Sequence, residues 1–225
     1  PRSYKKTGLS IDNAYSISYK SLKSAVKIAY KAANNNVKIF GSIAPLEDCY
    51  QPNLFPGYEI AIKEFQQLGM WLNNDKIDGI ILETMNNIKE AKAALDALKN
   101  LQKPLWISFY LKDYNHIASG ESLQKAINMV KQFEVDCLLL NCNSLELTEK
   151  SLEIIKSFWS DKLGIYPNLG PSPPISDGNI NNICTNKDYI LHLNRLLDYE
   201  LYIIGGCCGS NPTHTALLKK LISKR

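Results

Sequence analysis

The chain has 225 residues, of which 45% are hydrophobic and 21% charged, a composition typical of a globular domain with a sizeable core. Its net charge of +4 comes from basic residues spread along the chain, and the lack of a basic stripe with interleaved aromatic residues argues against nucleic-acid binding. No apolar run approaches the roughly 18 residues that a membrane-spanning helix needs, and no signal peptide opens the chain. We therefore expect a cytoplasmic protein with no membrane partner.

Six apolar runs with the character of β-strands follow one another along the chain. They are Val37–Ser42, Gly79–Thr84, Pro104–Phe109, Asp136–Asn141, Leu163–Asn168 and Leu201–Gly205. Most of them are continuously apolar rather than alternating in polarity, which is typical of parallel strands covered on both faces.

Segments with helical periodicity lie before, between and after these runs. The first places one apolar face on a helix, made by Leu22, Ala25, Val26, Ala29, Tyr30 and Ala33. The last helix is predicted to begin at Asn211, a good N-cap, with Pro212 at the first helical position. Repeated strand–helix units predict an α/β fold with a parallel sheet, in one domain over residues 1–225. The segment 170–182 is predicted to be a loop.

Such a sheet could be either an open doubly wound sheet or a closed (β/α)8 barrel. Six strands favour an open doubly wound sheet, but no Gly-rich phosphate loop follows any strand, so the nucleotide-binding fingerprint of that fold is missing. Polar and reactive residues instead follow several strands at their carboxyl ends. These residues are Glu83, Thr84, Asn141, Cys142, Asn168, Cys207 and Cys208. In a (β/α)8 barrel this rim carries the active site, which favours the barrel.

The sequence contains six cysteines, and three of them occupy strand ends: Cys142 and the adjacent pair Cys207 and Cys208. If these three thiols converge on one metal ion, a fourth coordination position stays open, as catalysis requires. Three disulfides are a weak interpretation for a chain of this size with an ordinary core. Redox chemistry at the vicinal pair is a further alternative. Cys49, Cys137 and Cys184 are then bystanders, with Cys137 facing the core.

At these residues the chain resembles the homocysteine S-methyltransferase family. The most specific match is the Gly-Gly-Cys-Cys-Gly segment at Gly205–Gly209. Further matches, in family order, are Gly41–Pro45, Glu83–Asn87, Ile107–Phe109, Asn141–Cys142 and Tyr166–Asn168. The resemblance implies a (β/α)8 TIM barrel whose third to eighth strands are the six apolar runs. The first two strand–helix units are missing from this mapping, so we expect a piece of a longer protein.

The resemblance also implies a site and a cofactor. Cys142, Cys207 and Cys208 would bind Zn²⁺, and the sulfur of the substrate would take the fourth position. Glu83 would bind the amino group of the substrate. We predict further substrate contacts from Ser42, Asn141 and Asn168, with the alternative that the two asparagines only cap strand ends. The long segment Ile43–Tyr58 would form a wall over the substrate or a plain surface loop.

The implied reaction is zinc-dependent transfer of a methyl group from a cationic donor, S-methylmethionine or S-adenosylmethionine, to the thiolate of homocysteine. The product would be methionine, and the partners would be small molecules, with a homo-oligomer also conceivable. Betaine is the alternative donor. A non-catalytic zinc-binding remnant, or a subunit that needs a partner to complete its barrel, is the alternative from another functional class.

Overall fold

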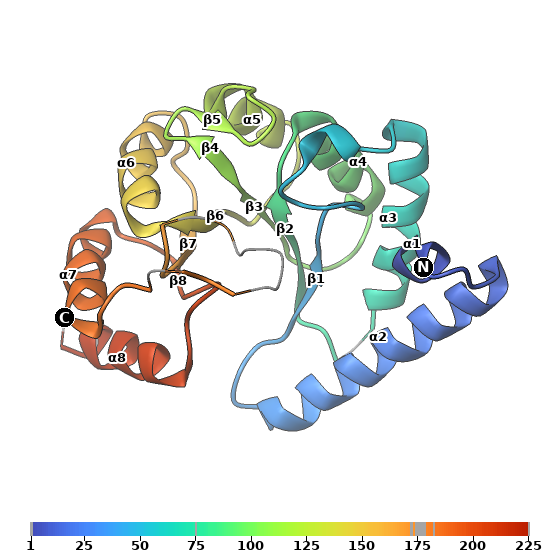
Figure 1. Ribbon diagram of the computed structural model, residues 1–225, viewed down its shortest axis with the longest axis horizontal. Coiled ribbons are helices and arrows are strands. Elements are labelled where there is room, and N and C mark those ends of the chain that lie inside the picture. Colours follow the sequence, from blue (N-terminus) through green and yellow to red (C-terminus); the bar gives the residue numbers. More distant parts are fainter. Residues whose placement is uncertain (1, 75, 172, 174–178, 182, 225) are drawn as a thin grey trace.

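A parallel six-stranded sheet forms the centre of the molecule in the computed structural model, which describes residues 2–74, 76–171, 173, 179–181 and 183–224. Its strands, in spatial order, are β1 (Phe40–Ile43), β2 (Gly79–Met85), β3 (Leu105–Phe109), β6 (Cys137–Ser144), β7 (Leu163–Asn168) and β8 (Ile203–Ile204). A separate short hairpin pairs β4 (Leu111–Asp113) with β5 (His116–Ile117). Figure 1 shows the sheet with its helices.

The described residues form eight α-helices. They are α1 (Arg2–Lys6), α2 (Ile11–Ala33), α3 (Tyr58–Leu72), α4 (Ile88–Leu98), α5 (Leu123–Val130), α6 (Leu145–Lys156), α7 (Asn186–Leu196) and α8 (Pro212–Ile222) among the described residues. Two short 3₁₀ turns are η1 (Pro52–Leu54) and η2 (Leu197–Tyr199). None of the helices in the described ranges has both the length and the apolar character needed to cross a bilayer.

The order of the strands decides between the open doubly wound sheet and the (β/α)8 barrel. Successive parallel strands of the chain are spatial neighbours throughout, and the order never reverses as it does in a doubly wound sheet. Because crossovers between parallel strands are right-handed, stepping always in one direction puts all the helices on one face of the sheet. Figure 1 shows this arrangement, with the helices around the outside of a curved sheet. The α/β class and the (β/α)8 type, with six strands present, are therefore confirmed.

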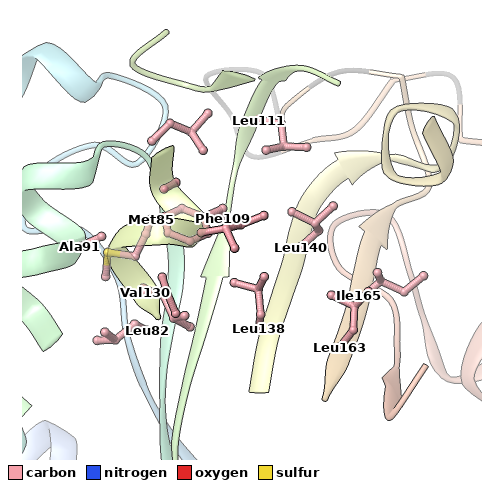
Figure 2. Packing of buried hydrophobic residues seen from close by; sticks show 14 of the residues in the cluster. Leu82, Met85, Ala91, Phe109, Leu111, Val130, Leu138, Leu140, Leu163 and Ile165 are labelled. Atoms are coloured by element: carbon pink, nitrogen blue, oxygen red, sulfur yellow. The ribbon is translucent and has the colours of Figure 1, made fainter. Parts of the chain in front are cut away.

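The main core fills the space between the outer face of the sheet and the helices. Leu82, Phe109 and Leu138 point outward from three neighbouring strands and meet Ala91 of α4 and Val130 of α5, all buried (Figure 2). The strand residues next to them in sequence point to the inner face, because side chains alternate along a strand. There Ile81, Cys137 and Leu139 form a second, smaller cluster.

The predicted elements exist, but several bounds differ. β1 begins at Phe40 rather than Val37, whose side chain is 65% exposed, and β8 covers only Ile203–Ile204. The hairpin β4–β5 was not predicted. The final helix begins as expected, with Asn211 as N-cap and Pro212 at its first position. Much of the loop predicted over 170–182 lies outside the described residues.

The predicted apolar face of the first helix is only partly buried. Helix α2 runs from Ile11 to Ala33, and Ala14 is its one fully buried residue. Leu22 and Val26 are half-buried against the main core, whereas Tyr30 is 42% exposed. The helix packs through Tyr15 and Tyr19 on Trp71 of α3, with ring centroids 4.8 and 5.3 Å apart. Because α2 packs on helix α3 rather than on the sheet, less of its apolar face is buried.

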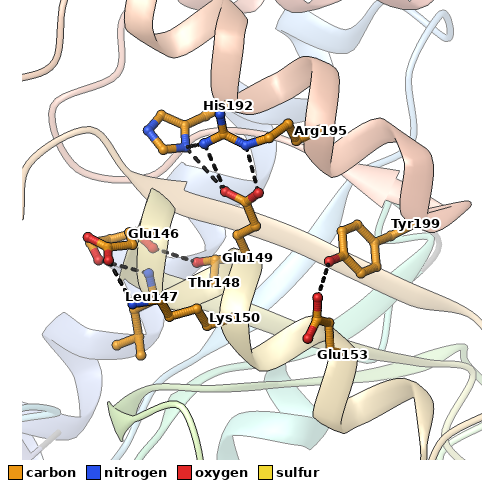
Figure 3. A network of polar contacts seen from close by, with 10 residues as sticks. Glu146, Leu147, Thr148, Glu149, Lys150, Glu153, His192, Arg195 and Tyr199 are labelled. Carbon is orange, nitrogen blue, oxygen red and sulfur yellow. Dashed lines mark hydrogen bonds and ion pairs between the residues drawn. The ribbon is translucent and has the colours of Figure 1, made fainter.

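Ion pairs join helices α6 and α7 on the surface (Figure 3). Two guanidinium nitrogens of Arg195, Nε and Nη2, donate to the Glu149 carboxylate at 2.7 and 3.0 Å, and His192 Nδ1 lies 3.4 Å from the same group. The Tyr199 hydroxyl donates to Glu153 at 3.4 Å. This network ties the helix that follows β6 to the helix that precedes β8.

Candidate metal centre

The carboxyl ends of β6 and β8 bring the three predicted metal ligands together. The sulfur atoms of Cys142, Cys207 and Cys208 all lie within 4.8 Å of one another, and the vicinal pair is separated by 3.9 Å. All six cysteines of the chain are free thiols. We call these three side chains the sulfur trio. Cys142 is buried, whereas Cys207 and Cys208 are half-buried, so solvent reaches the trio from the side of the vicinal pair.

A local irregularity of β6 aims Cys142 at its partners. The pairing of β6 with β7 shifts register between Asn141 and Ser144, and Cys142 has a left-handed backbone with φ 55°. Such bulges redirect a side chain and are frequent beside active sites. The turned carbonyl of Cys142 accepts a hydrogen bond from Asn168 Nδ2 at 2.9 Å. The strand therefore presents the thiol at the edge of the sheet.

The Gly-Gly-Cys-Cys-Gly segment places the other two thiols after β8. A Cβ atom added at Gly206 would lie 2.8 Å from the Cβ of Ser210, and Gly209 has φ 82°. The segment continues to pair with the end of β7, because Cys207 N donates to Pro167 O and Leu169 N donates to Cys208 O. Close approach at one glycine and a left-handed turn at the other thus fix both sulfurs beside β7.

The surroundings of the trio disfavour isolated thiolates. Contact with the Cys142 thiol, followed by burial, raises the pKa of Cys207, and burial followed by Cys207 raises the pKa of Cys208. A divalent cation bound by all three would offset this cost by displacing the protons. Three sulfur donors without a carboxylate suit zinc, and they leave a fourth tetrahedral position for another ligand. The donor set therefore fits the implied metal.

Two of the predicted substrate-binding residues contact each other next to this edge. Ser42 on β1 donates a hydrogen bond from its hydroxyl to Glu83 on β2. Glu83 is half-buried and Ser42 is exposed. The ring of Tyr166 lies nearby, since burial and then the Glu83 carboxylate raise the pKa of Tyr166. The carboxylate is thus held in place and remains accessible.

Asn141 and Asn168 are both only 1% exposed, and the polar atoms of both side chains form hydrogen bonds to neighbouring strands and strand ends. Asn141 Oδ1 accepts from Thr84 N at 3.0 Å and from Ser108 Oγ at 2.6 Å, and its Nδ2 donates to Thr84 Oγ1 at 2.7 Å. Asn168 bonds the backbones of Cys142 and Cys208. The structure therefore places both asparagines as links beneath the rim.

The sequence did not single out Cys49, Tyr50 or Tyr110, which lie around the trio. Tyr50 and Tyr110 form an edge-to-face pair with centroids 5.0 Å apart. Burial and then the neighbouring Cys142 raise the pKa of Tyr110 to about 12, and burial and Asp48 raise that of Cys49 to about 11, with Cys207 and Cys208 contributing. Only the length of the loop signalled a wall over the site.

Hydrogen bonds hold this loop over the trio. The buried carboxylate of Glu90 accepts from Leu46 N at 2.8 Å, and Asn86 Nδ2 donates to Cys49 O at 3.1 Å. Arg2 of α1 donates to Glu47 at 3.0 Å. The loop is therefore anchored at Leu46, Glu47 and Cys49, next to Tyr50, which favours a shaped wall over a plain surface loop.

A family model described as "Homocysteine S-methyltransferase" matches residues 3–222. The chain is 29% identical over 154 residues to Homocysteine S-methyltransferase 2 of Arabidopsis thaliana, covering 66% of this chain and 46% of that protein. It is 30% identical over 154 residues to Selenocysteine Se-methyltransferase of Brassica oleracea var. italica, covering 66% and 44%. The chain thus spans about half the length of the curated relatives it matches.

Solved structures show the same fold. The metallated form of the homocysteine methyltransferase MmuM from Escherichia coli superposes with a TM-score of 0.76 at 22% identity, covering 98% of this chain and 75% of that chain. Betaine-homocysteine S-methyltransferase of Drosophila melanogaster is 28% identical over 159 residues, covering 65% of this chain and 47% of that protein. The match of the family model over residues 3–222 shows that the chain belongs to the homocysteine S-methyltransferase family.

Proposed function

We propose that residues 1–225 act as one homocysteine-binding domain that transfers a methyl group from a cationic donor to the thiolate of homocysteine. The observation that supports this proposal most is the sulfur trio at the carboxyl edge of the sheet, with Glu83 and Ser42 on neighbouring strands. The product is methionine. The same family contains relatives named for homocysteine, betaine and selenocysteine, so the donor and the acceptor are matters for experiment.

The three cysteines have one role in this reaction, which is to hold the metal with an open position. A free thiol with a pKa near 8.5 is mostly protonated at neutral pH. Zinc, when bound, would take the homocysteine sulfur as its fourth ligand and keep it deprotonated. Three anionic ligands would also leave that sulfur electron-rich. Cys142, Cys207 and Cys208 thereby set both the place and the reactivity of the nucleophile.

The remaining residues orient the substrates. The Glu83 carboxylate would bind the ammonium group of homocysteine, and the Ser42 hydroxyl would keep that carboxylate in one orientation. The aromatic pair would cover the site, with Tyr50 on the loop after β1 and Tyr110 directly after β3. In the displacement, a sulfur–carbon bond forms to the methyl group as the bond to the positively charged donor sulfur breaks, and the donor leaves as a neutral sulfide. Alignment of the two reactants supplies much of the acceleration.

The proposal is tested with reduced, zinc-loaded protein, homocysteine and one methyl donor at a time. We expect methionine from S-methylmethionine or S-adenosylmethionine, and loss of the product after treatment with a chelator. Transfer from betaine alone would reverse the choice of donor. Absence of methionine with every donor, from protein shown to contain zinc, would contradict the proposed activity.

A second candidate function follows from the edges of the sheet. β1 pairs only with β2, and β8 only with β7, within the part of the chain that the structure describes. Such edges accept further strands. The chain would then be a metal-binding component that becomes active only with additional strands. A monomer in solution that methylates homocysteine by itself would exclude this candidate, whereas an inactive monomer that gains activity on assembly would favour it.

A further inference from the structure

One buried amide side chain joins the two segments that carry the sulfur trio. Asn168, at the end of β7, donates from Nδ2 to the carbonyl of Cys142 at 2.9 Å and accepts at Oδ1 from the backbone N–H of Cys208 at 3.2 Å. Its side chain is 1% exposed. An amide that is shielded from solvent and bonded at both ends to backbone has little freedom to move.

The bond to Cys142 acts where the backbone is strained. Cys142 has φ 55°, a conformation that non-glycine residues rarely adopt unless their surroundings impose it. The register shift between Asn141 and Ser144 turns this peptide out of the regular pattern of β6. Asn168 supplies a donor to the turned carbonyl, and thereby stabilises the conformation that points the thiol toward β8.

The bond to Cys208 fixes the other side of the site. Backbone bonds already pair Cys207 and Cys208 with Pro167 and Leu169, the residues on either side of Asn168. Those bonds hold the vicinal pair against β7 but do not reach Cys142. The Asn168 side chain bonds the backbones of both ligand-bearing segments directly.

We propose that Asn168 is a positioning residue of the metal centre, which sets the separation between Cys142 and the vicinal cysteines before the ion binds. This inference rests on the metal binding in the proposed function, and it assigns to Asn168 a role other than substrate contact. Supporting groups of this kind orient metal ligands, and their loss commonly lowers metal affinity about 10- to 100-fold.

A matched control lies two strands away from the vicinal pair. Asn143 is also 1% exposed and also bonds backbone at both ends of its amide, accepting from Leu111 N at 2.8 Å and donating to Phe109 O at 3.3 Å. Asn143 follows Cys142 directly in the sequence, but its side chain links β6 to Phe109 and Leu111 and hydrogen-bonds no backbone group of the trio. Its removal leaves a similar buried gap, so it measures the general cost of losing such an amide.

The test compares Asn168→Ala with Asn143→Ala in the full chain, using zinc affinity from chelator competition and the absorption spectrum with Co²⁺. We expect Asn168→Ala to lower zinc affinity about 10- to 100-fold. We also expect it to shift the sulfur-to-cobalt charge-transfer bands, while Asn143→Ala stays close to native in both readouts. Equal losses in the two variants, or native affinity in Asn168→Ala, would overturn the proposal.

If an alanine variant does not fold, two serine variants replace the alanine variants in the comparison. Asn168→Ser keeps one polar atom and is compared with Asn143→Ser by the same two readouts, with the same ranking expected. Because these measurements follow metal binding rather than turnover, they separate the two claims. Native protein that binds zinc but forms no methionine would contradict the proposed activity alone, whereas indistinguishable serine variants would contradict the role of Asn168 alone.

Discussion

Two residues at the carboxyl ends of strands adopt the left-handed conformation, and both are held by asparagine side chains. Thr84 has φ 56° and bonds Asn141 through its N–H and its hydroxyl, and Cys142 has φ 55° and bonds Asn168. Each lies at a register shift of its strand. Strained backbone of this kind costs roughly 1–3 kcal/mol per residue and persists where the surroundings impose it. The rim is thus shaped by bulges that the buried amides stabilise.

Of the two glycines that precede the vicinal cysteines, Gly206 is the one that a side chain would disturb more. A Cβ there would meet Ser210 Cβ at 2.8 Å, so we expect Gly206→Ala to lower the free energy of unfolding by about 1–3 kcal/mol. At Gly205 the nearest atom to an added Cβ is Tyr166 Cβ at 3.4 Å, an ordinary contact. Urea unfolding of Gly205→Ala is therefore the control, and a larger loss at Gly205 than at Gly206 would contradict this account.

At the scale of residues, the sequence predicted the ligands better than it predicted what holds them. Cys142 and the vicinal pair end apolar strands, and parallel strands place their carboxyl ends at one edge, so their proximity could be inferred. The bonds of Asn168 and the approach of Tyr50 could not. They depend on the register shift at Cys142 and on the path of a long loop, and neither leaves a periodic pattern in the sequence.

At the scale of elements, charged side chains fasten neighbouring helices to each other. Asp96 near the end of α4 accepts a hydrogen bond from Tyr58 of α3 at 2.7 Å and pairs with Lys92 and Lys99 of its own helix region. Burial alone would raise the pKa of Asp96, but these hydrogen bonds outweigh it and lower the pKa to about 2. The carboxylate therefore stabilises the contact between α3 and α4.

The depressed pKa of Asp96 predicts a pH dependence. Its contribution is complete above the ordinary value of 3.8 and is lost as the pH falls toward 2, because protonation then breaks the interactions. We expect Asp96→Asn to lower the free energy of unfolding by about 1 kcal/mol at pH 7. This difference should shrink steadily between pH 4 and about pH 2.

Urea unfolding at several pH values measures the difference between native protein and Asp96→Asn. Asp161→Asn, which removes an exposed carboxylate in the loop before β7, provides the control for the change in net charge. A difference that stays constant down to pH 2, or that Asp161→Asn reproduces, would show that the Asp96 interactions do not stabilise the helix pair.

The strands were more predictable than the way the helices pack. The central strand β7 (Leu163–Asn168) matches its predicted bounds, and β2 and β3 differ from theirs by one residue, because these strands are largely buried and continuously apolar. The fourth central strand, β6, begins one residue later and ends three residues later than predicted, beyond the register shift at Cys142. The edge strands β1 and β8 are shorter than predicted, since each has one neighbour to maintain its pairing. The periodicity of α2 predicted a buried face, but the amount of burial depends on which elements lie beside it.

At the scale of the whole molecule, the inner face of the sheet is less covered than the outer face. Ile81, Cys137 and Leu139 are buried there, whereas the stacked rings of Phe40 and Trp106, with centroids 3.8 Å apart, remain half-exposed. The two edge strands also face no further strand among the described residues. An ion held by the sulfur trio would join β6 to the segment after β8, and would stabilise the folded chain accordingly.

The central claim is that the folded sheet gathers three sulfurs, distant along the chain, into one metal site. Metal content and zinc affinity of freshly reduced native protein test it most directly, beside Cys142→Ser and the control Cys184→Ser, whose half-buried thiol lies outside the trio. We predict one zinc ion per chain in the native protein and in Cys184→Ser, with a severe loss of affinity in Cys142→Ser. No uptake by the native protein, or unchanged affinity in Cys142→Ser, would contradict the account.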